Sequence, residues 1–530
     1  MVTGMAMRPD IYPDESRCEC DLPAKICGFV RSSALIAITF VVACTALTAN
    51  AESWRVAPSV GVSETFSDNV TQGTSLGKES GRITDVRPEI RVDATGARVK
   101  GYFDFSIDRK TYSNQSSLNN SQKSLDSLLS VEAIEGWLYI DFRGAISQQN
   151  KSVFGVQNSD LTGAASNRTE TRVFQVSPYV KGHIGEIADY QLRFNGTEGK
   201  STDNTLSSTR VSEWVGRVKN AVSGAPIGWS LDASALEIHN NVVSKKTDNR
   251  ISGTLNYEVL PQLLASIIDG TESTDFAGQG TQNLSTPGIG VEWAPSPRTQ
   301  VAALEQKRFF GNGHSLLISH RTPLMAWKYS DNKDATALPS ALAASGQGAV
   351  YALMSDLLAA SIPDPLQRAD AVRAKLESTG KLASGAPGSG ALTSRVVLNR
   401  DRQFTIALLG AINTVTVTAT QSDQQGIGLG FGTTDSFSLS NELRVQGASV
   451  AWTHRLTPLS SLGIVEAYSR NNGVATTNLH SNQRSHSLLY STLLGPKTTA
   501  SLGLRSERFN STLATSSGQK AVVASMVHRF

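Results

Sequence analysis

The chain has 530 residues, of which 39% are hydrophobic and only 18% are charged, and its formal net charge is +3. This near-neutral balance excludes a strongly basic surface for nucleic acid, and the charged fraction lies below the roughly 25% typical of soluble domains. The length suits either about three soluble domains or one large β-barrel.

Residues 1–51 have the pattern of an N-terminal extension followed by a signal peptide. Arg31 precedes an apolar run over residues 34–47, and Ala49 and Ala51 form a small-residue cleavage site. We therefore expect an exported chain that starts at Glu52, with residues 52–530 as its barrel domain.

The cysteines all belong to this N-terminal segment, at positions 18, 20, 27 and 44. Cys18 and Cys20 are separated by one residue and have no histidine nearby, which does not suit a zinc site. An alternative to signal cleavage after Ala51 is lipid attachment at Cys44, which follows Val41-Val42-Ala43.

The rest of the chain is dominated by short segments in which apolar and polar residues alternate. In Val99–Asp108 the odd positions are apolar or glycine, and the even positions are polar except for Tyr102. Residues 138–143 and 190–195 alternate in the same way. A period of two is typical of a strand with one apolar and one polar face. Polar runs such as 150–167 are expected to be loops.

We predict an all-β fold, a transmembrane up-and-down antiparallel β-barrel of roughly 16 to 20 strands of about 9–12 residues each. A soluble β-sandwich would also contain alternating strands. Charged residues such as Lys100, Arg143 and Glu258 on the polar faces favour the barrel, because they suit a wet lumen. The chain also ends in an alternating strand that closes on Phe530, which we expect to be the signal for the barrel assembly machinery.

One segment, at about 338–382, has helical periodicity instead. Val350, Leu353, Met354 and Leu357 recur at helical spacing, and Asp364-Pro365 is typical of the start of a second helix. We expect a short helical insertion. It is either a helical hairpin in a loop at one barrel mouth, or a plug or gate inside the lumen, or a docking surface for a partner.

The segment after the signal peptide, Trp54–Val70 (WRVAPSVGVSETFSDNV), resembles the opening strand of the PEP-CTERM system-associated outer-membrane protein family. The Asp364-Pro365 helix, the segment Trp452–Pro458 and Phe530 are also similar to that family, so the resemblance spans Trp54–Phe530. It implies an outer-membrane β-barrel of an exopolysaccharide locus in a Gram-negative bacterium, serving polysaccharide export. No functional residues are carried over from the family.

The sequence contains no pattern that indicates catalysis, a cofactor or a metal. The glycines of 426–432 fall on every second residue, as along a strand, whereas a phosphate loop needs other spacing. His314-Ser315 and Ser485-His486-Ser487 supply residue types for hydrolysis, but polar wall residues explain them equally well. Asp68-Asn69 indicates a turn more readily than a calcium site. We expect no enzyme, no catalytic, cofactor-binding or metal residues, and no cofactor.

The sequence-based hypothesis is a pore or channel component that serves exopolysaccharide export, with Tyr102 and Tyr179 as candidate lumen contacts for sugar rings. The alternatives are a non-conducting scaffold for export partners and a barrel-borne enzyme that modifies polysaccharide or lipid. Expected partners are outer-membrane lipid, the barrel assembly machinery, exopolysaccharide and periplasmic export components, and not nucleic acid. Nothing in the sequence indicates an oligomeric state.

Overall fold

The computed structural model describes residues 53–530 except for 73–76, 158–166, 203–207, 221–225, 241–244, 279, 337–347, 360–361, 363, 379–391, 394, 428–434, 475–477 and 515. These residues belong to one compact unit, Glu52–Phe530. The predicted cleavage residues Ala49 and Ala51 and the four cysteines lie outside the described residues.

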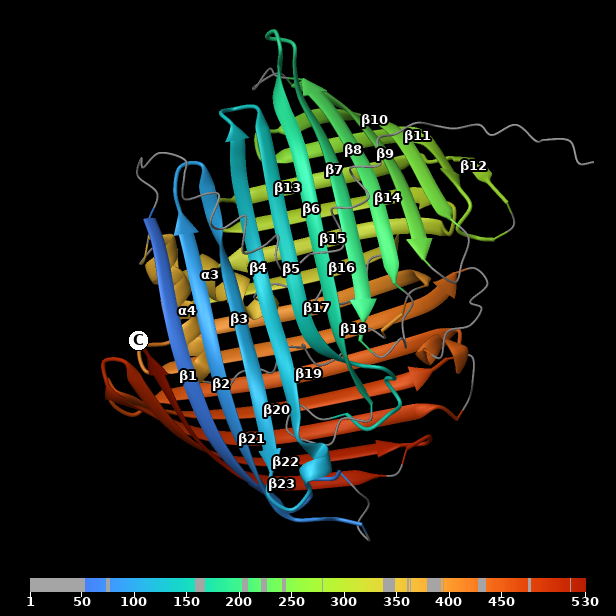
Figure 1. The fold of residues 1–530 in the computed structure, drawn as a ribbon. Coiled ribbons are helices and arrows are strands. Elements are labelled where there is room, and N and C mark those ends of the chain that lie inside the picture. The colour runs from blue at the N-terminus through green and yellow to red at the C-terminus, as the bar shows by residue number, and fades with distance from the viewer. Residues whose placement is uncertain are drawn as a thin grey trace, which may run out of the picture. The chain divides into compact units, whose positions relative to one another are not determined.

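The unit is a closed antiparallel β-barrel (Figure 1), as the alternating sequence predicts. The first strands are β1 (Ser53–Ser67), β2 (Gly81–Thr95), β3 (Val99–Tyr112), β4 (Asn120–Ile134), β5 (Leu138–Asn150), β6 (Arg168–Ile184), β7 (Ala188–Ser201), β8 (Thr209–Asn220), β9 (Ile227–Asn240), β10 (Lys246–Leu260), β11 (Leu263–Thr274) and β12 (Gln282–Ser285). The remaining strands are β13 (Gly288–Ser296), β14 (Thr299–Arg308), β15 (Gly311–Arg321), β16 (Met325–Thr336), β17 (Val396–Leu409), β18 (Asn413–Ile427), β19 (Glu442–Arg455), β20 (Ser460–Gly473), β21 (His480–Gly495), β22 (Thr498–Ser511) and β23 (Ser517–Arg529).

The barrel has 22 strand positions, more than the 16 to 20 expected, because β12 and β13 both pair with β11 and share one position. The sequence count was too low because several strands are joined by connections of only two residues. Only Phe309 and Phe310 separate β14 from β15, for example. Many strands are also longer than the 9–11 residues that a bilayer requires.

The two faces of the wall follow the alternation of the sequence. On β1, the residues Val56, Val62 and Phe66 are exposed and point outward, whereas Arg55 and its register partner Asp93 on β2 point inward. An apolar outer face and a polar inner face are what a barrel in lipid requires. The protein is therefore an outer-membrane type of β-barrel.

The two ends of the barrel differ in the lengths of their connections. One end has short turns such as 96–98, 135–137 and 261–262. The first strand, β1, begins at this end, and the last strand, β23, ends there. Gly136 and Gly185 supply the positive φ angles, 67° and 55°, that such tight turns need. The other end carries the long connections 68–80, 151–167 and 337–395. In outer-membrane barrels the short turns face the periplasm and the long loops face outside.

Tryptophans mark the short-turn end. All except Trp214 lie in a short turn or within a few residues of one, as Trp54, Trp293, Trp327 and Trp452 illustrate. Amphipathic aromatic rings prefer the boundary between lipid and water, so this girdle indicates the periplasmic membrane surface.

The helical insertion expected at about 338–382 contains α3 (Gly348–Leu358) and α4 (Pro365–Ser378) between β16 and β17. Two single turns of 3-10 helix, η1 (Ser116–Leu118) and η2 (Ser436–Ser438), lie in long connections. Of the helices described, none combines the length and apolar character needed to span a membrane.

The closing seam between β1 and β23 gives a first prediction. Ser63 and Ser525 are register partners whose side chains face the lumen, and directly opposed Cβ atoms lie about 4.5–5.5 Å apart, near the range of a disulfide. The double variant Ser63→Cys, Ser525→Cys should therefore oxidise to a disulfide that circularises nearly the whole barrel domain. Mobility of the boiled, unreduced protein on a denaturing gel measures this.

The matched control is Ser63→Cys, Ala521→Cys, because Ala521 faces the lumen but pairs with Ser67. Its cysteines would lie about 13 Å apart along the strand. Equal crosslinking of both pairs would contradict the register of the seam.

Candidate functional site

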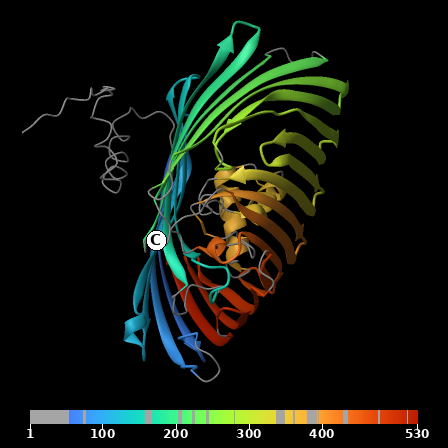
Figure 2. The ribbon, with the colours of Figure 1, turned by 90° about the vertical axis from the view of Figure 1, so that its right-hand side faces the viewer.

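The helical insertion lies inside the ring of strands (Figure 2). Leu353, Met354 and Val372 from the two helices are buried in one cluster with Ala326 on β16 and Ala407 on β17. Ala326 and Ala407 are register partners on the inner face, near the short-turn end. Their small side chains leave room for α3 to pack directly on the wall.

An ion-pair cluster ties α4 to a different part of the wall. The Arg55 guanidinium on β1 donates to both carboxylate oxygens of Asp370, at 2.5 and 3.0 Å, and to Asp93 on β2 at 2.8 Å. Arg91 bridges from Asp93 to Asp104 on β3, at 2.8 and 3.0 Å. We call the contact between Arg55 and Asp370 the latch.

The insertion thus leaves the wall at the long-loop end and reaches residues near the short-turn end. This decides between the two sequence-based interpretations, because a loop at one mouth could not contact both Ala326 and Arg55. The helices instead span from the inner face of β16 and β17 to that of β1 and β2.

Arg373 on α4 points into the same cluster. Burial lowers its pKa below the ordinary arginine value, and the charge of Arg91 acts in the same direction. Its carboxylate contact is Asp370, at 3.4 Å. Asp370 therefore holds two arginines, one on its own helix and one on the wall.

The long-loop end is closed by a different kind of contact. Residues 151–157, between β5 and β6, fold inward, and Phe154 is fully buried with Val397 and Phe437. The Val153 carbonyl accepts hydrogen bonds from Asn471 and Ser481 at 3.0 and 2.6 Å, and the Phe154 carbonyl accepts one from Ser511 at 2.7 Å. This loop therefore bridges from β5 and β6 to β20, β21 and β22.

A second apolar bridge forms around Phe276, which follows β11. Phe276 is buried between Val211 and Ile238 of β8 and β9 and Val396 of β17. β8 and β9 pair with each other, but β17 is a neighbour of neither, so Phe276 links separate parts of the inner wall.

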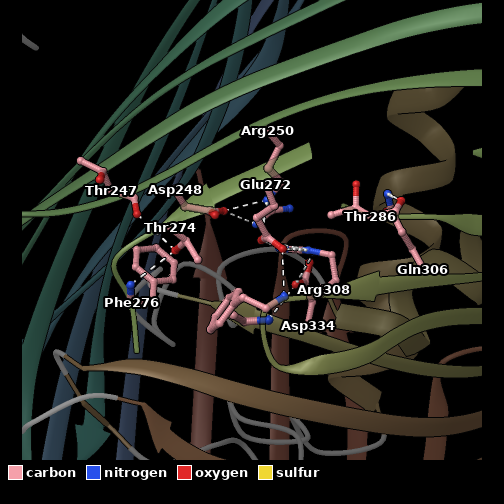
Figure 3. A network of polar contacts seen from close by, with 12 residues as sticks. Thr247, Asp248, Arg250, Glu272, Thr274, Phe276, Thr286, Gln306, Arg308 and Asp334 are labelled. Carbon is pink, nitrogen blue, oxygen red and sulfur yellow. Dashed lines mark hydrogen bonds and ion pairs between the residues drawn. The ribbon is translucent and has the colours of Figure 1, made fainter. Parts of the chain in front are cut away.

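A buried ionic network holds this second bridge in place (Figure 3). The Glu272 carboxylate is 0% exposed, and the Arg308 guanidinium donates to it from Nη2 at 2.8 Å and from Nε at 3.0 Å. Glu272 also accepts from the backbone N–H of Phe309 at 2.9 Å, and Phe309 packs on Phe276. Asp334 binds the other side of Arg308 at 3.0 Å.

Both predicted sugar-contact residues face the lumen, on the wall formed by β3 to β7. Tyr102 lies under Arg91 and donates a hydrogen bond to Asp126 at 3.1 Å. Tyr179 lies under Arg193, 4.0 Å from its ring centre, and stacks on Tyr139 at 5.1 Å.

Tyr139 was missed by the sequence reasoning, although its signal was present. It belongs to the same alternating segment as Asp141, and both point inward. The stack with Tyr179 depends on strand register, which the alternation alone does not specify. We refer to Tyr102, Tyr139 and Tyr179 as the tyrosine strip.

Phe530, the predicted assembly signal, lies at the closing seam. Its backbone N–H donates to the Pro58 carbonyl at 3.0 Å, and its side chain is 64% exposed on the outer face. Its role in assembly stays a prediction. Asp68 and Asn69 accept from Lys520 and donate to Gly518, respectively, so they fasten the first long loop to β23.

The serine and histidine neighbours in the sequence do not assemble into a triad within the described part of the chain. His314 binds Asp331 at 3.0 Å on the outer face, whereas Ser315 faces the other way and binds Asn332. His486 binds Glu466, and Ser506 lies opposite His486 in register without a hydrogen bond between them. Within the same described ranges, no three histidine or carboxylate side chains gather at metal-binding distance.

Comparison with known proteins finds no matching family model and no matching curated protein. Solved structures do match. The FrpB iron transporter from Neisseria meningitidis (F5-1 variant) is 12% identical, with a TM-score of 0.46, over 89% of this chain and 82% of that one. The siderophore receptor PirA from Acinetobacter baumannii is 7% identical, with a TM-score of 0.44, over 89% and 80%. OpdO from Pseudomonas aeruginosa is 9% identical, with a TM-score of 0.30, over 90% and 97%. These values describe a shared barrel architecture and nothing finer.

The Glu272 network gives a second prediction. Glu272→Leu would leave the Arg308 side chain, which is 7% exposed, with only Asp334 as a carboxylate partner. Removing one member of a buried pair costs about 3–5 kcal/mol, so the free energy of unfolding should fall by roughly 3 kcal/mol in a denaturant titration of the detergent-solubilised barrel.

Glu272→Leu combined with Arg308→Leu should recover much of this loss, because both buried charges are then removed and Asp334, the other partner of Arg308, is 56% exposed to water. Glu305→Gln, on the exposed outer face of β14, is the control. An effect of Glu272→Leu no larger than that of the control would show that the network contributes nothing to the closure.

Proposed function

We propose that this protein is a gated outer-membrane channel for a hydrophilic polymer, with the helical insertion as its gate. The observation that carries the proposal is the latch: a helix inside the lumen contacts the wall of β1 through a half-exposed ion pair, Arg55 to Asp370. Barrels of 22 strands enclose a lumen too wide for wall side chains to fill, and they hold a plug there.

The energetics of the latch suit a gate. Arg55 and Asp370 are 38% and 46% exposed, so water screens their attraction. Exposed ion pairs contribute about 0.2–1 kcal/mol. Such a contact biases the insertion toward the wall and still breaks readily. The buried cluster around Met354 includes Val372 of α4, so it holds both helices on β16 and β17, and the latch governs only the contact between α4 and β1.

The inner wall suits a polysaccharide. Sugar hydroxyls need hydrogen-bonding partners, and the faces of sugar rings stack on aromatic rings. The tyrosine strip supplies rings beside charged groups such as Asp126, Asp141 and Arg193. A strip of weak contacts holds a polymer without trapping it, which passage requires.

Exopolysaccharide as the polymer rests on the resemblance of Trp54–Val70 to the PEP-CTERM system-associated outer-membrane protein family. The same resemblance supports a role in an export system, in which the polymer would pass outward. The barrel geometry supports passage of a hydrophilic polymer in general and does not identify the sugar.

Single-channel conductance in planar bilayers tests the gate. The wild-type protein should be mostly closed, and deletion of residues 338–382 should give long-lived open steps. Asp370→Asn should raise the open probability about two- to fivefold, as loss of about 0.5–1 kcal/mol implies. The control is Asp356→Asn, an exposed residue of α3 with the same change of charge.

Three outcomes would contradict the gate. Silence of the deletion variant, with a folded barrel shown by heat-modifiable migration on a gel, would mean that the insertion does not close the lumen. Equal effects of Asp370→Asn and Asp356→Asn on the open probability would show that the contact between Arg55 and Asp370 does not hold the gate closed. Large open steps in the wild type would show that the lumen is already open.

The tyrosine strip gives a separate prediction. Tyr102→Ala combined with Tyr179→Ala should reduce export of exopolysaccharide by about two- to tenfold, which corresponds to aromatic contacts of about 0.5–1.5 kcal/mol. Secreted polymer per folded barrel is the measurement. Tyr329→Ala with Tyr490→Ala is the control, because both of these tyrosines face lipid. Unchanged export in the lumen variant would exclude the strip as a sugar contact.

A further inference from the structure

A pocket of about 240 Å³ lies on the outer face of the wall, over β20, β21 and β22. Its lining residues are Tyr468, Asn482, Arg484, Arg508 and Asn510. Tyr468, Arg484 and Arg508 are register partners in one row across the three strands, and Asn482 and Asn510 form the next row toward the long loops. The pocket faces away from the lumen, so a passing polymer does not explain it.

The charge of this pocket is uncompensated. Arg484 and Arg508 are both exposed, and neither has a carboxylate partner among the described residues. Arg484 lies 5.4 Å from the ring centre of Tyr468. The nearest carboxylate in the row below, Glu466, is already paired with His486.

Three other outward arginines on the barrel are paired with carboxylates. Arg400 binds Asp331 at 2.6 Å, Arg444 binds Asp423 at 2.5 Å, and Arg172 binds Glu170 at 2.6 Å. What distinguishes Arg484 and Arg508 is that two such groups lie side by side in one pocket with no carboxylate partner among the described residues.

The height of the pocket relative to the lipid narrows the choice of ligand. Two rows below the arginines, the outward residues are Ile464, Leu488 and Leu504, all exposed and apolar. Two rows are four residues, about 13 Å along a strand, or about 9 Å along the membrane normal at a tilt of 45°. The arginines thus lie just above the acyl-chain layer at the long-loop end, which faces outside.

We propose that this pocket binds the phosphorylated sugar headgroup of an outer-leaflet glycolipid. The two guanidinium groups offer paired N–H donors to a phosphate. The Tyr468 ring offers a stacking face to the adjoining sugar, and the Asn482 and Asn510 amides offer hydrogen bonds to its hydroxyls. The acyl chains of the bound glycolipid lie on Ile464, Leu488 and Leu504, so one molecule contacts both layers.

The proposal favours a lipid over free phosphate because the pocket is continuous with the lipid-facing band. A free anion would use only the arginines, whereas a glycolipid also uses the apolar residues below them and the tyrosine and amides beside them. The site is independent of the proposed channel, since none of its residues faces the lumen.

Native mass spectrometry of the full-length protein in detergent, titrated with bisphosphorylated lipid A, tests the site. The wild type should retain at least one lipid. Arg484→Gln combined with Arg508→Gln should bind about tenfold more weakly or worse, since hydrogen bonds to charged groups contribute about 1.5–3 kcal/mol each. The affinity of the variant Arg484→Lys with Arg508→Lys for lipid A should lie between those of the wild type and the glutamine variant.

The matched control is Arg172→Gln with Arg210→Gln, two outward arginines on β6 and β8 that lie beside Glu170 and Glu198. Heat-modifiable migration establishes that each variant is folded. If the control variant lost lipid A binding to the same extent, the effect would come from the overall charge of the protein, and the proposed site would be overturned.

Competitors separate the sources of phosphate. Dephosphorylated lipid A should bind much more weakly than the bisphosphorylated form. Displacement of lipid A by millimolar inorganic phosphate would mean a free-anion site, and equal binding of phosphatidylglycerol would mean that the sugar is not recognised. Either result would overturn the glycolipid assignment. Neither result bears on the proposed channel, which the conductance measurements test separately.

Discussion

The structure depends on one constraint: in a bilayer every backbone N–H and C=O must find a partner within the protein. An open sheet would leave the edges of β1 and β23 unpaired in lipid. The pairing of Ser59–Ser67 with Ala521–Arg529 removes both edges. Closure fixes the barrel at 22 strand positions, and that number fixes a lumen that the wall side chains cannot fill. The insertion and the inward-folded loops occupy part of this wide lumen.

The inward contacts at the two ends of the lumen differ in kind. At the long-loop end, Phe154 and Phe276 are buried in apolar clusters, and backbone carbonyls are bound by buried side chains. At the short-turn end, Met354 and Val372 are buried against β16 and β17, and the contact between α4 and β1 is a half-exposed ion pair. An exposed ion pair weakens as salt rises, because ions screen its charges. Ionic strength should therefore act on the latch much more than on the apolar contacts.

The sequence predicted the local features well and the long-range ones poorly. Alternation placed Tyr102 and Tyr179 on the inner face, and helical spacing placed both helices. The same pattern failed at the strand ends: the mainly polar run 471–483 includes the end of β20 and the start of β21. Above the lipid both faces of a strand are wet, so alternation disappears there although the strand continues. The pocket proposed to bind glycolipid lies in that zone, where the alternation of the sequence does not identify the outer face.

The latch was unpredictable for another reason. Arg55 and Asp370 are 315 residues apart in sequence, and neither residue type is unusual for its surroundings. Their contact exists because closure of the barrel makes β1 part of the wall around the same lumen that the insertion crosses. Only the three-dimensional ring, and no local pattern, brings a helix that follows β16 to the first strand of the barrel.

The covalent attachment of the insertion to both β16 and β17 has a kinetic consequence. When the contact between Arg55 and Asp370 breaks, the two groups cannot diffuse apart, because both belong to the same chain. Linked groups of this kind face each other at effective concentrations in the millimolar range. Return is then a first-order event whose rate does not depend on the amount of protein in the membrane. In the proposed gate, the return of α4 to β1 is therefore an event within each single copy of the protein.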